Sequence, residues 1–520
     1  MADVVIVGGG HNGLVAGCYL AKAGLDVQVL EGLDRPGGGA RTEERVPGYL
    51  FDLHSAAHNI INMTSIPDEL DLAGAGLRYQ EMDPFSVAIH RDGRRVRFFR
   101  SVEQTLDSIA EFDSAEAKAY DQFIKEALRV VKLILPAVGG ASSPGELPGK
   151  IAGAAGLFMN SGLESVRDVL GSYEALLRRR LPSDHTRGPV AAFAAHAGVG
   201  PSVSGGALYA YWQAAYHMFG QWHGVGGSQA LTDALVTRFR SFGGELRCSA
   251  RVERIETLRG RISGVVLEGG ERIVTRQVIT ALDPKVALLE LLDPPLGGKA
   301  GSDLEAVSRG NVVQALIHVA TNRLPPYQDA RAGDWNGLQS YVDSLDVLSK
   351  GWKMSEANML PDPLPLYSFT PSAIDDSLAP EGGHTVYVAC PAAPVEIQGG
   401  WPNARERFIE AALDVIEARA PGFRDSIVGM TTFLPDEMER DEHWAGAHPM
   451  HIDISLDQIG IFRPTRALAG HRTPIEGLFI SGAGTAPTGG IAGTPGKLAA
   501  LALLKSRKPS VKLWRKLKTL

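Results

Sequence analysis

The sequence has few cysteines, and they form no recognisable motif. Only Cys18, Cys248 and Cys390 occur in 520 residues, and no two of them have C-x-x-C spacing. This scatter argues against a disulfide framework and gives no indication of a cysteine metal site. We expect each cysteine to be a packed apolar residue.

Two further absences narrow the class of protein. No apolar run reaches the ~20 residues that a membrane-spanning helix needs, and the formal net charge of −7 gives no general nucleic-acid signal. Charged residues make up 21% of the chain and hydrophobic residues 44%, which is typical of a globular enzyme. The first predicted strand starts at residue 4 and leaves no room for a secretory signal, so we expect a cytoplasmic enzyme without a nucleic-acid partner.

A glycine-rich turn follows the first predicted strand. Residues 4–7 (VVIV) form a continuous β-branched run, the pattern of a parallel strand buried on both faces. Gly8, Gly10 and Gly13 then give G-x-G-x-x-G, and residues 14–23 are predicted to be helical. In this arrangement the glycines allow a tight turn, close approach of a pyrophosphate and helix packing, with the helix N-terminus facing the anion. The motif predicts a dinucleotide site.

The context of this turn separates it from an ordinary βαβ turn. Residues 27–30 supply a second buried strand that ends in Glu31, close to the roughly 20-residue separation expected for an acid that binds ribose hydroxyls. An acid at this position disfavours a 2′-phosphate. The following stretch, DRPGGGARTEE, matches the R-x-G-G-R-x-x-[ST] pattern of FAD enzymes, although Gly39 replaces the second arginine and Arg41 lies nearby. These features favour FAD.

A second glycine turn lies near the end of the sequence. In GLFISGAGTAPTGGIAG, residues 478–481 are a predicted strand, and a final helix is predicted to begin near Gly490. The N-terminus of such a helix can stabilise negative charge on a reduced flavin. No second complete G-x-G-x-x-G follows a strand, so we expect no separate NAD(P)H domain.

The length of the chain suits two interleaved domains. We predict an α/β fold in which a Rossmann-type FAD-binding domain is interleaved with an α+β substrate domain. The predicted segments are 1–65, 205–290 and 445–505 for the FAD-binding domain, 66–204 and 291–444 for the substrate domain, and 506–520 for a basic C-terminal tail.

These motifs resemble the phytoene desaturase-like branch of the FAD-dependent amine oxidase superfamily, and within it the pyridine nucleotide-disulfide oxidoreductase domain 2 group. The resemblance covers nearly the whole chain and is carried by VIVGGGHNGLVAGCYLAKAG, RPGGGARTEE, GVGGSQALTDAL, GAHPMHIDISLDQ and GLFISGAGTAPTGGIAG. One departure is Ala486, which stands where many relatives carry histidine.

The resemblance implies a set of FAD contacts. Noncovalent contacts are implied for Gly8, Gly10, Asn12, Gly13, Glu31, Gly38, Arg41 and Thr42. It also implies that the backbone of Val252 meets adenine and that Gly482, Gly490 and Ile491 lie near the flavin.

Histidines are the candidates for proton transfer beside a flavin. His54 and His58 have i,i+4 spacing and would share one face of a helix. They are interpreted either as flavin or substrate contacts or as packed, hydrogen-bonded residues. A metal pair also fits this spacing, but no acidic or cysteine partner accompanies it, so no metal is expected.

An aromatic stretch, ALYAYWQAAYHMFGQWHGVGG, precedes the second cofactor segment. It contains two more candidate catalytic residues, His217 and His223. Its rings can form a wall that holds a planar or unsaturated substrate against the flavin, or they can be ordinary core residues. His448 and His451 are predicted to hydrogen-bond at the domain junction.

The predicted function is an FAD-dependent oxidoreductase that removes hydride from a small hydrophobic or unsaturated substrate and passes electrons to O₂ or a quinone. One alternative is an FAD amine oxidase, and another is a flavin-dependent double-bond isomerase or a non-redox flavoprotein. The basic tail, KSRKPSVKLWRKLKTL, has leucines at helical spacing and is interpreted either as a peripheral membrane contact or as a solvated or self-docked helix end.

Overall fold

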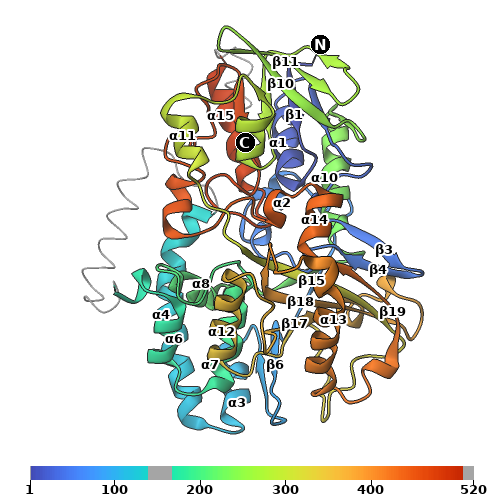
Figure 1. Cartoon of the computed structure of the whole chain (residues 1–520), viewed down its shortest axis with the longest axis vertical. Helices are drawn as coiled ribbons and strands as arrows, with labels where there is room; N and C mark the ends of the chain where they lie inside the picture. The colour runs from blue at the N-terminus through green and yellow to red at the C-terminus, as the bar shows by residue number, and fades with distance from the viewer. Residues whose placement is uncertain (1, 139–166, 508–520) are drawn as a thin grey trace.

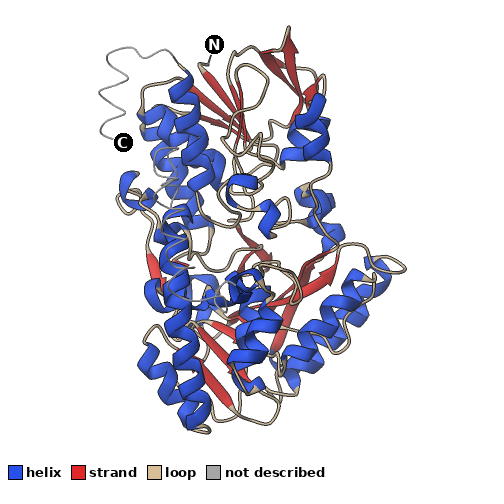
Figure 2. Cartoon of the chain, turned by 90° about the vertical axis from the view of Figure 1, so that its left-hand side faces the viewer, coloured by secondary structure: helices blue, strands red, loops and turns tan. Residues whose placement is uncertain are grey.

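The computed structural model describes residues 2–138 and 167–507. Two units are stacked along the long axis of the molecule, one built on a parallel sheet at the top of Figure 1 and one on a mixed sheet below it. Helices flank the strands of both units (Figure 2). The predicted α/β fold with a Rossmann-type domain is confirmed.

The upper unit is organised by a five-stranded parallel sheet. In spatial order its strands are β20 (Leu478–Ile480), β13 (Val278–Thr280), β1 (Val4–Val7), β2 (Val27–Leu30) and β9 (Glu245–Arg247). Alternate side chains of β1 point to opposite faces. Val4 and Ile6 pack against α1 (His11–Lys22), α10 (Gln229–Ser241) and α15 (Thr494–Ser506), which explains why the strand reads as one unbroken apolar run.

A four-stranded sheet covers the other face of the parallel sheet. Its order is β12 (Arg272–Ile273), β11 (Arg261–Leu267), β10 (Val252–Leu258) and β14 (Leu292–Asp293), followed along the chain by α11 (Gly298–Glu305). Val5 and Val7 of β1 pack against Ile255 and Val265 of this sheet. The cofactor sheet is therefore enclosed on both sides.

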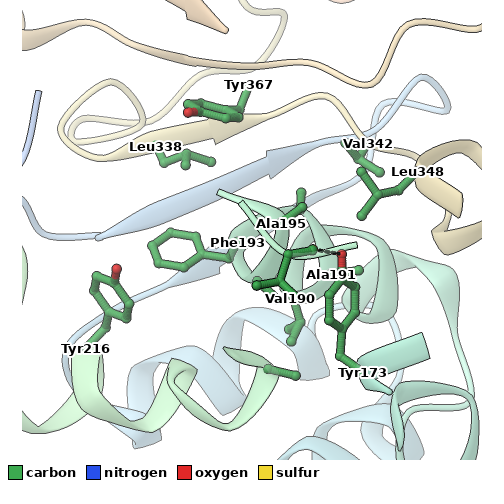
Figure 3. Packing of buried hydrophobic residues seen from close by; sticks show 14 of the residues in the cluster. Tyr173, Val190, Ala191, Phe193, Ala195, Tyr216, Leu338, Val342, Leu348 and Tyr367 are labelled. Atoms are coloured by element: carbon green, nitrogen blue, oxygen red, sulfur yellow. Dashed lines mark hydrogen bonds between the residues drawn. The ribbon is translucent and has the colours of Figure 1, made fainter. Parts of the chain in front are cut away.

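The lower unit is built on a seven-stranded sheet. In spatial order its strands are β19 (Ile427–Phe433), β15 (Val312–Thr321), β18 (His384–Pro394), β17 (Tyr367–Phe369), β16 (Leu338–Ser340), β6 (Ser86–Ile89) and β7 (Arg95–Phe98). Ile317 and Val319 of β15 face α13 (Trp401–Glu417), whereas Leu316 faces the helical core on the opposite side. Figure 3 shows part of this helical core beside the strands that carry Leu338 and Tyr367.

Further helices and two hairpins complete the described chain. The other α-helices are α2 (Ile66–Glu69), α3 (Val102–Ala110), α4 (Ser114–Val138), α6 (Tyr173–Arg180), α7 (Asp184–Ala195), α8 (Ala207–Tyr211), α9 (Gln213–Phe219), α12 (Leu345–Glu356) and α14 (Pro435–Glu442). The two-stranded pairs are β3 (Thr42–Val46) with β4 (Tyr49–Asp52), and β5 (Tyr79–Glu81) with β8 (Trp222–Gly224). No helix within residues 2–138 and 167–507 is long and apolar enough to cross a bilayer.

The strands of the parallel and seven-stranded sheets lie inside the segments predicted for the two domains, but elements near the predicted boundaries pack differently. Helices α8 and α9, which follow the boundary at residue 205, belong to the same core cluster as α4 and α7 of the other unit. Strand β14 pairs with β10 although it follows the boundary at residue 290. The domain boundaries themselves stay predictions. The three cysteines are free, with Cys18 and Cys390 buried and Cys248 half-buried.

The crossing of α1 and α15 leaves no room for a side chain at Gly496, because a Cβ there would collide with the carbonyl oxygen of Asn12. We expect Gly496→Ala to push the helices apart and lower the free energy of unfolding by about 1–3 kcal/mol, although alanine is the better helix former. Urea denaturation measures this change. Gly470→Ala is the matched control, because a Cβ at Gly470 meets nothing within 4 Å. Equal stability of the two variants would contradict the prediction.

Candidate active site

A cavity of about 610 Å³ lies between the two units. One side is formed by the glycine turns at the carboxyl ends of β1, β2, β13 and β20. The opposite side is formed by residues of α7, α8, α9 and β15. The carboxyl edge of a parallel sheet is the expected binding position in this kind of fold.

The three glycines of the first turn have different structural roles. Gly8 has φ +104°, which a side chain rarely adopts, and a Cβ at Gly13 would collide with the carbonyl oxygen of Gly8. In contrast, a Cβ at Gly10 would meet nothing within 4 Å, and α1 begins directly after Gly10 without a side-chain cap. Gly10 therefore opens the helix N-terminus to the cavity, whereas Gly13 packs the helix on the strand.

Glu31, the residue predicted to bind the ribose, lines the cavity. Its Oε2 accepts a hydrogen bond from the backbone N–H of Gly9 at 2.7 Å, and its Oε1 accepts one from Leu33 at 2.9 Å. Burial raises the pKa of the carboxyl group, although these hydrogen bonds oppose the shift. The carboxylate holds the glycine turn in shape as well as facing the cavity.

Most of the predicted cofactor residues line the cavity, namely Gly8, Gly10, Asn12, Glu31, Gly38, Val252, Gly482, Gly490 and Ile491. The Oδ1 atom of Asn12 is buried and has no partner within the described protein. An open glycine, a helix N-terminus without a side-chain cap, a ribose-facing acid and an unpartnered amide oxygen together fit a bound dinucleotide.

The other predicted cofactor residues lie behind the cavity wall. Besides Gly13, these are Arg41 and Thr42. Arg41 forms ion pairs with Glu43 and Glu442, and Thr42 donates to Asp52 at 2.6 Å. Their side chains hold the wall together, and their contact with a cofactor stays a prediction.

The last glycine turn starts its helix later than the sequence predicts. Helix α15 begins at Thr494 rather than near Gly490. The reason is Gly493, which has φ +69° and so interrupts right-handed helical geometry just before Pro495. Gly490 and Ile491 consequently line the cavity from a loop.

A buried arginine joins this last turn to the preceding loop. Arg463 is fully buried, and its guanidinium donates hydrogen bonds to carbonyl oxygens only, those of Met450, Ile452, Asp453, Gln458 and Ala483. Burial lowers its pKa to about 10, which still leaves it charged at neutral pH. Nothing in the sequence around Arg463 marks it as a buried residue, so this role was not predicted.

Of the four predicted catalytic histidines, the structure brings His54 to the cavity. Its Nε2 atom is buried without a partner in the described protein, and its ring makes an edge contact with Trp444 at 5.4 Å between centroids. Burial lowers its pKa to about 3, with smaller contributions from His196 and His448. The ring is therefore neutral at physiological pH.

The other three predicted histidines lie outside the cavity lining. Nδ1 of His58 is 2.9 Å from the Tyr79 hydroxyl, and His54 and His58 do not share a helix. Nε2 of His217 is 2.9 Å from the Tyr120 hydroxyl. Burial lowers the pKa of His58 to about 3 and that of His217 to about 4. No group in the described chain has the composition of a metal site.

His223 differs from these histidines because it has a carboxylate partner. Its Nε2 atom is 3.0 Å from Oδ2 of Asp375, and the pair is completely enclosed. Burial opposes charge on the ring, but the hydrogen bond to Asp375 and the charges of Asp52 and Asp375 outweigh it and raise the pKa of His223. The pKa of Asp375 falls to about 2, because hydrogen bonds from His223, Ser377 and Gly226 outweigh burial.

The substrate side of the cavity is aromatic, as the aromatic stretch suggested. Tyr209, Trp212 and Tyr216 line it, and the Tyr216 ring packs edge-on against Phe193 with centroids 4.5 Å apart (Figure 3). The Tyr209 hydroxyl donates to the Ile454 carbonyl at 2.6 Å. Part of the aromatic stretch therefore lines the cavity, and the rest of the same segment packs elsewhere in the protein.

Other lining residues were missed, among them His196, Gln314, Trp444 and Met450. They come from separate elements, and no spacing in the sequence connects them. His448 and His451 line the cavity as well, and Nδ1 of His451 accepts from the Gly484 N–H at 3.3 Å. This contact joins two loops within the segment 445–505 predicted for the FAD-binding domain, so the role of the two histidines at the domain junction stays a prediction.

Comparison with known proteins agrees with this geometry. The family described as "Flavin containing amine oxidoreductase" matches residues 13–494, and the chain belongs to this family. Its cofactor is FAD, and the protein is an FAD-dependent oxidoreductase.

Individual relatives lie in the predicted group. Pyridine nucleotide-disulfide oxidoreductase domain-containing protein 2 of Rattus norvegicus is 28% identical over 97% of this chain and 94% of its own length. A lycopene-forming phytoene desaturase of Pseudescherichia vulneris is 27% identical over 97% of this chain and 99% of its own length. A structure of putrescine oxidase bound to putrescine has a TM-score of 0.62 at 16% identity, covering 97% of this chain and 99% of the other. That structural likeness shows the fold alone.

The role proposed for Gly10 can be tested by filling the space beside it. We expect Gly10→Val to fold normally, because a Cβ there meets no protein atom within 4 Å. The added side chain would occupy the path of the pyrophosphate and weaken FAD binding about tenfold or more, or at least ~1.4 kcal/mol. Flavin absorbance of the purified protein and circular dichroism measure the two effects. Gly297→Val, at an exposed open position, should retain FAD, and full FAD content in Gly10→Val would refute the assignment.

The His223–Asp375 pair predicts a pH dependence of stability. Because the pKa of His223 is raised, its contribution is complete below about pH 6.5 and is lost as pH rises through the raised value. Asp375→Asn should remove this decline and cost about 3–5 kcal/mol of unfolding free energy below that pH. Urea denaturation at several pH values measures both. Asp376→Asn, at the exposed neighbouring position, should behave like the unaltered protein, and an unchanged decline in Asp375→Asn would contradict the assignment.

Proposed function

We propose that this FAD-dependent oxidoreductase removes hydride from an uncharged, largely apolar organic substrate, as a dehydrogenase, desaturase or oxidase. The observation that carries the proposal is the charge distribution of the cavity. Among the described residues, its substrate side presents aromatic and aliphatic residues together with neutral imidazoles, and no carboxylate that lacks a partner. An ammonium group bound there would lose its hydration without an opposite charge to replace it.

The carboxylates that do line the cavity are already engaged. Glu31 accepts two backbone hydrogen bonds at the ribose position. Asp283 forms an ion pair with Arg309 at 2.8 Å, and Glu442 forms one with Arg41 at 2.8 Å. This arrangement favours a neutral substrate over the protonated amine that an amine oxidase would receive.

The chain's own residues supply binding and orientation. The open turn at Gly10 and the N-terminus of α1 hold the pyrophosphate, and Glu31 holds the ribose. The aromatic wall of Tyr209, Trp212 and Tyr216 positions an apolar skeleton and excludes water. FAD, when bound, supplies the hydride-accepting chemistry.

The electron acceptor, the size of the substrate and the location of the protein are part of the same proposal. We propose O₂ or a quinone as the electron acceptor and a small hydrophobic molecule as the substrate. A cytoplasmic location with peripheral membrane contact through residues 506–520 is also proposed. Most of that tail lies outside the described residues, so its support is the basic, leucine-containing sequence alone.

Anaerobic reduction of the bound flavin tests the function. We expect neutral apolar compounds to bleach the flavin absorbance at least about tenfold faster than the primary amines of matching skeleton, since burying an unpaired ammonium costs several kcal/mol. NADPH should leave the flavin oxidised, because the sequence has no second nucleotide motif. Air and then a soluble quinone are admitted afterwards to identify the acceptor.

A cavity variant ties this reduction to the proposed site. Val313→Phe adds a ring to the lining and should raise the substrate concentration for half-maximal reduction without loss of FAD. Val428→Phe, at a strand position that is 52% exposed, is the matched control. Reduction by amines alone would favour the amine oxidase alternative. Substrate turnover without any bleaching would favour the isomerase alternative.

A further inference from the structure

Two cavity histidines share an unusual set of contacts. The Tyr387 hydroxyl donates a hydrogen bond to the backbone carbonyl of His54 at 2.7 Å. The side-chain amide of Gln314 donates one to the backbone carbonyl of His196 at 3.0 Å. Among the described residues, no hydrogen bond reaches the ring nitrogens of either histidine. The described part of the chain therefore holds both backbones in place and offers neither imidazole a polar partner.

The orientation of each ring is maintained by aromatic neighbours. The His196 ring packs edge-on against Tyr367 with centroids 5.4 Å apart, and the Tyr367 hydroxyl donates to Gln314 at 3.1 Å. The His54 ring packs edge-on against Trp444. Rings that are fixed by packing present their nitrogens in a defined direction, which is the arrangement of a prepared binding site.

Both histidines line the cavity. His196 caps the end of α7, and Phe193 of that helix contacts both His196 and Tyr216 of the aromatic wall. The residues that hold the two backbones lie on paired strands, Gln314 on β15 and Tyr387 on β18. Both histidines have a pKa lowered by burial, to about 3 for His54 and about 4 for His196. Each neutral ring offers one N–H donor and one nitrogen acceptor.

We propose that the substrate carries a neutral oxygen function, a ketone or a hydroxyl group, on its apolar skeleton, and that His54 and His196 bind this oxygen. The proposal rests on the proposed function, since it names the substrate class of the same site. A pure hydrocarbon would displace water and leave two imidazoles without hydrogen bonds, which disfavours its binding. An ammonium group would require a free carboxylate, which the described part of the wall does not offer.

The test compares four ligands of one skeleton. The FAD-loaded protein is titrated anaerobically with 2-octanone, 2-octanol, octane and 2-aminooctane, and binding is followed by the change in the flavin absorption spectrum. We expect the ketone or the alcohol to bind at least about tenfold more tightly than octane. Bound octane would leave the histidine nitrogens without a hydrogen-bond partner, which disfavours its binding. The amine should bind more weakly than either oxygen compound at neutral pH.

Variants assign this preference to the two histidines. His54→Phe and His196→Phe should each reduce the preference for the oxygen compound over octane severalfold, with little change in octane affinity. His54→Asn and His196→Gln retain a hydrogen-bonding amide and should keep part of the preference, which also covers the case in which a phenylalanine variant fails to fold. His384→Phe is the control, because His384 lies outside the cavity lining.

The outcomes separate this proposal from the proposed function. Octane binding as tightly as the ketone and the alcohol would overturn the oxygen-binding role and leave the apolar-substrate function in place. A preference that persists in both phenylalanine variants would also overturn the role of the histidines. Tightest binding of the amine, or no spectral response to any of the four ligands, would overturn both proposals.

Discussion

The cavity depends on the buried guanidinium of Arg463. A charge removed from water is costly unless its hydrogen-bonding groups are satisfied, and Arg463 meets this condition entirely with backbone carbonyls of residues 450–458 and of Ala483. Those carbonyls belong to two loops that line the cavity from separate parts of the sequence. A hydrocarbon side chain would leave these acceptors unpaired, so the cation acts as the common donor that fixes the distance between the two loops.

The interleaved chain explains why such a connector is needed. Each strand of the parallel sheet ends at the same edge, so the turns after β1, β2, β13 and β20 meet, although β13 and β20 follow the first two strands by hundreds of residues along the chain. The intervening segments form the seven-stranded sheet and its helices, which supply the opposite wall. A site made at this junction brings a nucleotide-binding edge and a shaped apolar wall together without requiring either unit to provide both.

The nucleotide half of the site was predictable from sequence, because its chemistry is local. Gly8, Gly10 and Gly13 act within one turn, and Glu31 follows at the end of the adjacent strand. The substrate half was not predictable in the same way, since His196 and Gln314 come from different elements and meet only through packing of the two units. Likewise the start of α15 was set by the backbone conformation of one glycine, which periodicity does not reveal.

The histidines show most clearly that the sequence alone does not determine the partner and the protonation state of a side chain. His54 has no acidic partner among the described residues and is neutral, whereas Asp375 raises the pKa of the buried His223. The same rule governs the other charges: Glu442 is paired with Arg41 in the wall rather than left free in the cavity. Paired charges thus lie in the scaffold, and neutral imidazoles of His54 and His196 line the cavity. The proposal of an uncharged substrate follows from this division, because a charged group placed beside these rings, away from the helix N-terminus that faces the pyrophosphate, would lose hydration without compensation.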